Sequence, residues 1–292
     1  MPLTTMNVSL LSAISGVLLL TTSCMYRPIV KDKSVTYDPS TGMKMDVYAP
    51  KKKGEAKEMM VFVHGGNWNS GKRNTYRYFG RKMARKGIVT AIIDYRLAYG
   101  TGFANMAEDV AMSVKYLQEH ATEYNGDAKK TFVSGHSAGG HLAALVSLDD
   151  RYFKKAKVQY PAKGMILIDA FGLDIHDYLS RQEYATDSIY YPTFTKKPEK
   201  WTEGSPVHYL HKGMPQILMF TGEKTAVGIT RDNYNFWSKA KDIQTGLKII
   251  TVPGKRHAGM IIQFVNSGNR NYDRILKFIH DPNMMTEQII EM

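Results

Sequence analysis

The chain has 292 residues, of which 43% are apolar and 23% are charged, and this balance excludes a disordered or fibrous protein. It contains one cysteine, which excludes an intrachain disulfide and a cluster of thiolate metal ligands. Lysine and arginine outnumber aspartate and glutamate by 39 to 27, so the formal net charge is +12. The length is compatible with two domains or with one large α/β domain that carries insertions.

The N-terminal segment has no charged side chain before residue 24, and residues 8–20 are a run of thirteen without a charge, mostly apolar. The run is too short to span a bilayer and fits the apolar region of a secretory signal. It leads into Thr21-Thr22-Ser23-Cys24, which is similar to a bacterial lipoprotein cleavage site. We therefore expect a signal peptide over residues 1–23 and a lipid at Cys24 that anchors an exported protein to a bacterial membrane, at its periplasmic face or the cell surface. The alternative is a buried N-terminal helix with a passive cysteine.

After a tether and first strand region over residues 24–42, apolar runs alternate with amphipathic segments. The runs predict strands at 43–47, 59–63, 88–93, 131–134, 164–168, 216–220 and 247–252. The amphipathic segments predict helices at 76–86, 103–117, 137–148, 232–241 and 271–280. This alternation predicts an α/β fold over residues 43–292: one doubly wound, mostly parallel sheet with helices on both faces.

Residues 174–205 interrupt the alternation and are rich in aromatic side chains. Six of them lie between positions 178 and 201: Tyr178, Tyr184, Tyr190, Tyr191, Phe194 and Trp201. We expect an insertion that forms a cap or pocket wall over the carboxyl edge of the sheet. The alternative is a loop that only packs its aromatic side chains against the domain.

The pentapeptide Gly135-His136-Ser137-Ala138-Gly139 fits the G-x-S-x-G pattern and lies between a predicted strand and a predicted helix. A serine in such a turn stands exposed at a helix N-terminus, with glycines that leave room for a strained backbone. This context predicts that Ser137 is a nucleophile. The alternative is an ordinary helix-capping serine.

A glycine pair, Gly65 and Gly66, follows the strand at 59–63. Backbone N–H groups exposed there, together with that of Ala138 after the nucleophile, predict an oxyanion-binding site. A competing pattern overlaps this loop, because Gly66 to Lys72 reads G-x-x-x-x-G-K as in a phosphate-binding loop. Its eighth position is Arg73, so the hydroxyl that would bind Mg²⁺ is missing.

His257 is the predicted general base among nine histidines, because it follows the last predicted strand in a turn above the carboxyl edge of the sheet. We expect His136 and His141, which flank the nucleophile, to pack or to form hydrogen bonds. His208 and His211 are three residues apart and could share a metal ion, but no third ligand is apparent, so no metal site is expected.

Several ordered motifs carry a family resemblance between about residues 46 and 280. They are HGGNW with Ser70-Gly71-Lys72, DYRLA at 94–98, AEDV at 107–110, GHSAGGHLAAL at 135–145, Gly204-Ser205-Pro206 and the His257 loop. The chain resembles the α/β-hydrolase superfamily, and within it the carboxylesterases related to hormone-sensitive lipase and to bacterial feruloyl and acetyl xylan esterases. The resemblance implies ester hydrolysis through an acyl-enzyme, without a metal or organic cofactor. The motifs do not specify the substrate.

The triad acid is the point where the sequence departs from that pattern. The usual aspartate position in the loop after the strand at 216–220 is Thr225, which does not ionise. The nearest carboxylate, Glu223, is the favoured acid, and Asp232 is its first alternative. Asp169, Asp174 and a Ser–His dyad without an acid also remain open. A second departure is Asn67, where many relatives have a third glycine.

Three function classes follow. The first is a serine carboxylesterase that acts on short-acyl or aryl esters, including esters of acylated carbohydrate. The second is an amidase, an aryl formamidase or a peptidase on the same scaffold, and the third is a non-catalytic binding protein displayed at the surface. The positive charge lies in short clusters without a nucleic-acid-binding module, so no nucleic-acid partner is expected, whereas anionic lipid or acidic polysaccharide would be attracted.

Overall fold

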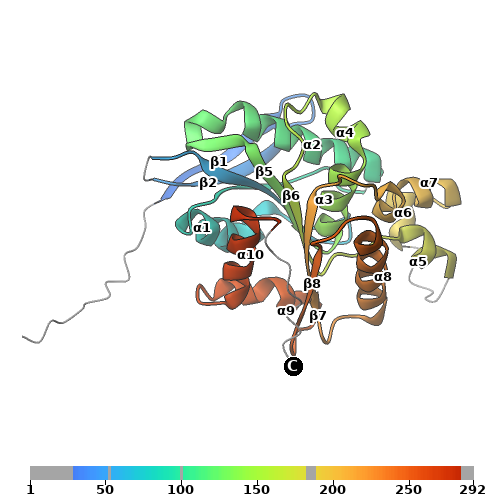
Figure 1. Cartoon of the computed structure of the whole chain (residues 1–292). Helices are drawn as coiled ribbons and strands as arrows, with labels where there is room; N and C mark the ends of the chain where they lie inside the picture. The colour runs from blue at the N-terminus through green and yellow to red at the C-terminus, as the bar shows by residue number, and fades with distance from the viewer. Residues whose placement is uncertain (1–28, 52–53, 99–100, 182–188, 284–292) are drawn as a thin grey trace, which may run out of the picture.

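The structure is a computed structural model, and it describes residues 29–51, 54–98, 101–181 and 189–283 (Figure 1). The predicted signal peptide and Cys24 lie outside the described residues. In the described part of the predicted tether, a strand begins at Ile29.

One sheet forms the centre of the molecule, and in the described residues it has eight strands in the order β1-β2-β4-β3-β5-β6-β7-β8. The strands are β1 (Ile29–Asp38), β2 (Met43–Pro50), β3 (Lys57–Val63), β4 (Val89–Ile93), β5 (Gly126–His136), β6 (Gly164–Ile168), β7 (Gln216–Gly222) and β8 (Lys248–Val252). β1 pairs with β2, and β2 with β4, in antiparallel fashion, and all other neighbours are parallel. The carboxyl ends of the six parallel strands therefore meet at one edge.

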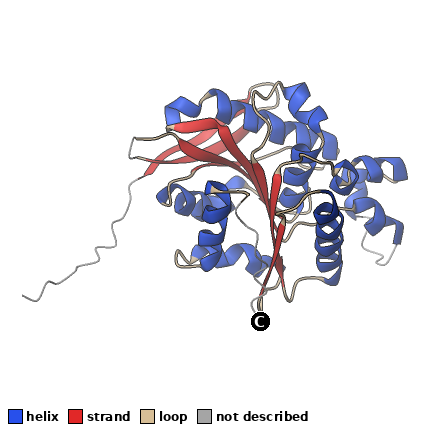
Figure 2. Ribbon diagram, viewed as in Figure 1, coloured by secondary structure: helices blue, strands red, loops and turns tan. Residues whose placement is uncertain are grey.

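Helices cover both faces of the sheet (Figure 2). One face is covered by α1 (Arg77–Arg85), α9 (His257–Ile262) and α10 (Arg270–His280). The other is covered by α2 (Phe103–Glu119), α3 (Ala138–Leu148), α4 (Asp150–Ala156) and α8 (Val227–Ile243).

Strand β3 illustrates why its residues must be apolar throughout. Met59, Val61 and Val63 belong to the core on the α2–α3 side, whereas Met60 and Phe62 belong to the core on the α1–α10 side. Alternate side chains of a strand point to opposite faces, so a strand covered on both faces loses its polar alternation. This accounts for the uninterrupted apolar runs in the sequence.

The predicted α/β-hydrolase architecture is confirmed. Each of the seven predicted strands and five predicted helices corresponds to an observed element, and most of them begin within two residues of the predicted start. The largest differences are β5, which begins five residues earlier than predicted, and α8, which begins at Val227 rather than at 232. Within the described ranges, no helix is both long and apolar enough to cross a membrane.

The segment between β6 and β7 contains the short helices α5 (Ile175–Arg181), α6 (Tyr191–Phe194) and α7 (Pro198–Glu203). Figure 1 shows them together at the side of the molecule near α8. Because this segment follows the carboxyl end of β6, it lies at the edge of the sheet where the predicted site residues converge.

Candidate active site

Ser137 lies in a sharp turn between β5 and α3. Its backbone has φ 56° and ψ −125°, an unusual conformation for a residue with a side chain. The turn is tight because Gly139 packs on β3: a Cβ at this position would lie 2.2 Å from the carbonyl oxygen of Val63. The alternation of strand, strained serine and helix is that of a nucleophile elbow.

His257 lies at the same carboxyl edge of the sheet, after β8, which is the last strand in the sheet order. It is the first residue of α9, directly after the turn that follows β8. Its Nε2 lies 2.9 Å from Ser137 Oγ, which is hydrogen-bond distance. The structure thus brings together the two residues that the sequence predicted as nucleophile and base.

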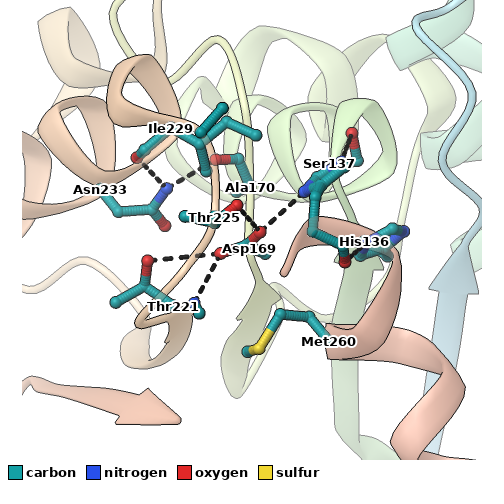
Figure 3. Close-up of polar contacts among 12 residues, drawn as sticks. His136, Ser137, Asp169, Ala170, Thr221, Thr225, Ile229, Asn233 and Met260 are labelled. Atoms are coloured by element: carbon teal, nitrogen blue, oxygen red, sulfur yellow. Dashed lines mark hydrogen bonds and ion pairs between the residues drawn. The ribbon is translucent and has the colours of Figure 1, made fainter. Parts of the chain in front are cut away.

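Asp169 supplies the carboxylate at the other side of the imidazole. Its Oδ2 lies 2.7 Å from His257 Nδ1, and its side chain is fully buried. Asp169 follows β6 directly and has φ 47°, so its side chain leaves the sheet edge toward the neighbouring β7 loop. Figure 3 shows the contacts of Asp169 with Thr221, near the end of β7, and with Thr225 in the loop after it.

The favoured acid of the sequence analysis, Glu223, is wrong. Glu223 is exposed, and its carboxylate accepts a hydrogen bond from the N–H of Gly254 at 2.6 Å. The β7 loop turns after Gly222 so that Thr225, and not Glu223, faces the site: Thr225 N–H donates to the Gly222 carbonyl at 3.2 Å.

The other two candidate acids also have structural partners. Asp232, on α8, accepts hydrogen bonds of 2.8 Å from the N–H groups of Gly172, Leu173 and Asp174. Asp174 accepts the N–H of Asp177 at 3.0 Å. The sequence signal for Asp169 is its position directly after the predicted strand at 164–168, the next strand in the chain after the one before Ser137. Asp169 is one of the alternatives that the sequence leaves open.

The two histidines beside the nucleophile are buried, as expected, and form hydrogen bonds. His141 Nδ1 accepts from the Trp68 indole at 3.1 Å, and burial lowers the pKa of His141 to about 4. Burial, helped by the nearby charge of His257, lowers the pKa of His136 to about 3. Both imidazoles are therefore neutral near pH 7. Their hydrogen bonds within the described residues go to other groups, whereas Nε2 of His257 contacts Ser137 Oγ.

His136 belongs to a chain of contacts that ends at the base. Gly65 N–H donates to the Tyr76 hydroxyl at 3.0 Å, and that hydroxyl lies 3.3 Å from His136 Nδ1. His136 Nε2 lies 3.4 Å from the carbonyl oxygen of His257, and the two rings stack at 4.8 Å. The contacts connect the β3 loop, the elbow and the base.

The Gly65 contact corrects the predicted oxyanion site. The N–H of Gly65 already has an acceptor, so the prediction is wrong for this residue. Within the described chain, the N–H groups of Gly66 and Asn67 donate to no protein atom, and Ala138 opens α3, where an N–H has no partner in the helix. Gly65 instead provides close packing, because a Cβ there would lie 3.1 Å from Ser137 Cβ.

A cleft of about 350 Å³ opens beside the nucleophile. It is lined by Asn67, Ser137, Phe171, Tyr178, Tyr190, Ala226, Val227, Gly228, Ile229 and His257. The rings of Phe171 and Tyr178 meet edge to face at 4.8 Å. Of the aromatic residues in the insertion, Tyr178 and Tyr190 line the cleft, whereas Phe194 and Trp201 are buried. The insertion therefore forms part of the pocket wall and also packs aromatic side chains against the domain. Tyr184 lies outside the described residues.

Comparison with family models gives a match to BD-FAE over residues 45–234, which is more than half of the chain. The chain belongs to the BD-FAE family. This family match spans the Gly65–Gly66 loop, the elbow and Asp169, but it ends before His257.

Relatives of this BD-FAE chain include esterases and formamidases. It is 23% identical over 254 residues to a probable isoprenylcysteine alpha-carbonyl methylesterase of Arabidopsis thaliana, covering 82% of this chain and 53% of that protein. It is 23% identical over 264 residues to a kynurenine formamidase of Danio rerio, covering 88% of this chain and 80% of that one. The chain thus spans about half the length of the first of these relatives.

Solved structures show the same fold. A truncated form of a carbohydrate esterase from gut microbiota superposes with a TM-score of 0.73 at 18% identity, covering 87% of this chain and 96% of that one. At this identity the likeness supports the α/β-hydrolase fold that the sheet order had already indicated.

The phosphate-loop pattern in this BD-FAE chain has a different use. Trp68 is fully buried within the loop, and Arg73 pairs with Asp46 at 3.0 Å and with Asp94. These contacts fasten the loop to β2 and to the end of β4. In the part of the chain that the structure describes, no group of three His, Cys, Asp or Glu side chains is arranged to hold a metal ion.

Proposed function

We propose that this protein is a serine carboxylesterase with Ser137 as nucleophile, His257 as general base and Asp169 as triad acid. One observation carries the proposal: a continuous set of contacts, 2.9 Å from Ser137 to His257 and 2.7 Å from His257 to Asp169, beside an open cleft. The relatives named as esterases support the reaction class.

The geometry gives each group a role. Ser137 Oγ attacks the ester carbonyl carbon while His257 Nε2 takes its proton, and Asp169 stabilises the resulting imidazolium through Nδ1–H. The negative oxygen of the tetrahedral intermediate is held by the N–H groups of Gly66, Asn67 and Ala138. His257 then protonates the departing alcohol, and an acyl group remains on Ser137.

The second half of the reaction reuses the same groups. Water enters the cleft and gives a proton to His257 as its oxygen attacks the acyl carbon. The intermediate collapses, the carboxylic acid leaves and Ser137 regains its proton from His257. No proton is left unaccounted for, and no cofactor is required by these steps.

The cleft favours a small or planar substrate. A volume of about 350 Å³ with Phe171, Tyr178 and Tyr190 in its wall suits a short acyl group or one aromatic ring. We therefore propose short-acyl or aryl esters, including esters of acylated carbohydrate. The kynurenine formamidases among the relatives favour a second candidate, the hydrolysis of an aryl formamide.

Hydrolysis of 4-nitrophenyl acetate and of an N-formyl aryl amine by the full chain tests both candidates. Ser137→Ala should lower kcat for the preferred substrate by at least about 10⁴-fold. Ser147→Ala is the matched control, because this serine lies at the other end of α3 and its buried hydroxyl makes no hydrogen bond to any residue that the structure describes. Equal rates for the wild type and Ser137→Ala would refute the serine mechanism, and the ratio of kcat/KM for the two substrates decides between esterase and formamidase.

We also propose export with lipid attachment at Cys24, which rests on the sequence of residues 8–24. Labelled palmitate should enter the wild type expressed in a bacterium and should be absent from Cys24→Ser. Ester hydrolysis by Cys24→Ser should equal that of the wild type, because catalysis in the proposal depends on residues 65–257.

A further inference from the structure

The buried carboxylate of Asp169 has other hydrogen-bond partners besides His257. Its Oδ1 accepts hydrogen bonds from the N–H of Gly222 at 2.9 Å and from the Thr221 hydroxyl at 3.3 Å. Its Oδ2 accepts the Thr225 hydroxyl at 2.5 Å, the shortest of these contacts. All three donors come from the end of β7 and the loop after it, more than fifty residues away along the chain (Figure 3).

The Thr225 contact differs from the other two because it falls on the oxygen that serves the base. Oδ2 lies 2.7 Å from His257 Nδ1 and 2.5 Å from Thr225 Oγ1. A threonine hydroxyl has one proton to donate, and a carboxylate only accepts, so the direction of this bond is fixed. The donor therefore holds Oδ2 in place and shares its negative charge with the imidazole.

The loop that carries Thr225 is itself attached to the strand and turn that carry the base. Glu223 N–H donates to the carbonyl of Val252 at 3.1 Å, and Lys224 N–H donates to that of Lys255 at 2.9 Å. Thr225 is thus placed relative to both Asp169 and His257 by backbone hydrogen bonds. The Thr225 hydroxyl and the His257 imidazole contact the same oxygen, Oδ2 of Asp169.

We propose that Thr225 is a positioning residue of the triad: its hydroxyl fixes the carboxylate oxygen that orients His257, and position 225 is itself within reach of the same imidazole. This inference rests on the proposed function of Ser137, His257 and Asp169.

Thr225→Val removes the hydroxyl and keeps the shape of the side chain. We expect kcat/KM to fall about tenfold, as for a lost hydrogen bond to a charged group. With one donor fewer, the carboxylate stabilises the imidazolium more strongly, so the acidic limb of the pH profile should move to higher pH. Thr225→Ser, which keeps the donor, should restore both values to within about twofold of the wild type.

Thr230→Val is the matched control, since this threonine is similarly half-buried and its hydroxyl donates to the carbonyl of Ala226 at 3.5 Å, within its own helix turn. This variant makes the same replacement of a hydroxyl by a methyl group, and we expect it to leave the pH profile unchanged. If Thr225→Val has the kcat/KM and the acidic limb of Thr230→Val, the positioning role is overturned.

A second test moves the carboxylate. Asp169→Asn should lose most of the activity, and Asp169→Asn/Thr225→Asp should recover at least about tenfold over Asp169→Asn, because a carboxylate at 225 would contact His257 directly. A double variant no more active than Asp169→Asn overturns the claim that position 225 reaches the imidazole.

The two proposals fail in different ways. The rate at which a fluorophosphonate labels Ser137 needs no known substrate and is measured for every variant. Loss of labelling only in Ser137→Ala, with Thr225→Val labelled as fast as the wild type, retains the serine nucleophile and overturns the role of Thr225. Labelling that persists in Ser137→Ala overturns the proposed function itself.

Discussion

The nucleophile side and the acid side of the site are assembled in different ways. Ser137, its glycines and its helix come from one continuous stretch, β5 through α3, and the turn is held by local packing against β3. Asp169 is held by Thr221, Gly222 and Thr225, which belong to another strand and loop. The nucleophile side is thus one stretch of chain packed on β3, whereas the acid side depends on the pairing of β6 with β7. The acid side is therefore the part of the proposed triad that local sequence patterns specify least.

The largest expected effect tests which carboxylate serves the base. Asp169→Asn should lower kcat by about 10⁴-fold, because an amide at this place favours the wrong tautomer of His257 and does not stabilise its cation. Glu223→Gln should change kcat by less than about threefold, since the Glu223 carboxylate accepts its hydrogen bond from Gly254 in the turn after β8 and not from His257. The measurement is the steady-state hydrolysis of 4-nitrophenyl acetate by both variants, and the reverse order of effects would contradict Asp169 as the acid.

A smaller effect tests the nucleophile side. Tyr76→Phe leaves Gly65 N–H without its acceptor and His136 without its contact at 3.3 Å. We expect a loss of about 1–3 kcal/mol in the free energy of unfolding and a fall in kcat of roughly tenfold, because the β3 loop is no longer tied to the elbow.

Tyr272→Phe is the matched control for that change. Tyr272 is buried and donates to the carbonyl of Phe264 at 2.6 Å, away from the triad. It should lose a similar free energy of unfolding and keep the wild-type kcat. Equal losses of kcat in Tyr76→Phe and Tyr272→Phe would show that the Tyr76 hydroxyl acts only on stability.

The smallest effect on catalysis is expected at Asp232, which holds the backbone after Asp169. Burial outweighs its three N–H donors and raises the pKa of Asp232 from 3.8 to about 7. A raised pKa in the folded state gives a stability contribution that is complete below about pH 4 and is lost as pH rises through 7. Relative to Asp232→Asn, the wild type should lose a few kcal/mol of unfolding free energy between about pH 4 and pH 7, in proportion to the pKa shift.

Urea unfolding at a series of pH values measures this difference. Asp242→Asn removes an exposed carboxylate from the same helix and should leave the pH slope of the wild type unchanged. A difference between the wild type and Asp232→Asn that stays constant with pH would contradict the raised pKa. Both variants should keep kcat within a fewfold of the wild type.

The sequence predicts well those features that a short stretch determines. The apolar runs reveal the strands, and G-x-S-x-G at 135–139 reveals the turn, because both depend on neighbouring residues. The sequence favours Glu223 over Asp169 wrongly, because a contact between positions 169 and 257 leaves no periodicity or spacing in the chain. The donor role of Gly65 was missed for the same reason, since its acceptor, Tyr76, lies on the following helix.

The approach of α3 to β3 at Gly139 has a mechanical consequence. At Gly139, no side chain separates the start of α3, directly after Ser137, from the carbonyls of Val63 and His64, the last residues before Gly65 and Gly66. Interiors packed this closely are nearly incompressible, so we expect the start of α3 and the end of β3 to keep their relative position. In the proposed mechanism, the distance from Ser137 Oγ to the N–H groups of Gly66 and Asn67 then depends on the contact of α3 with β3 rather than on the segment between β6 and β7.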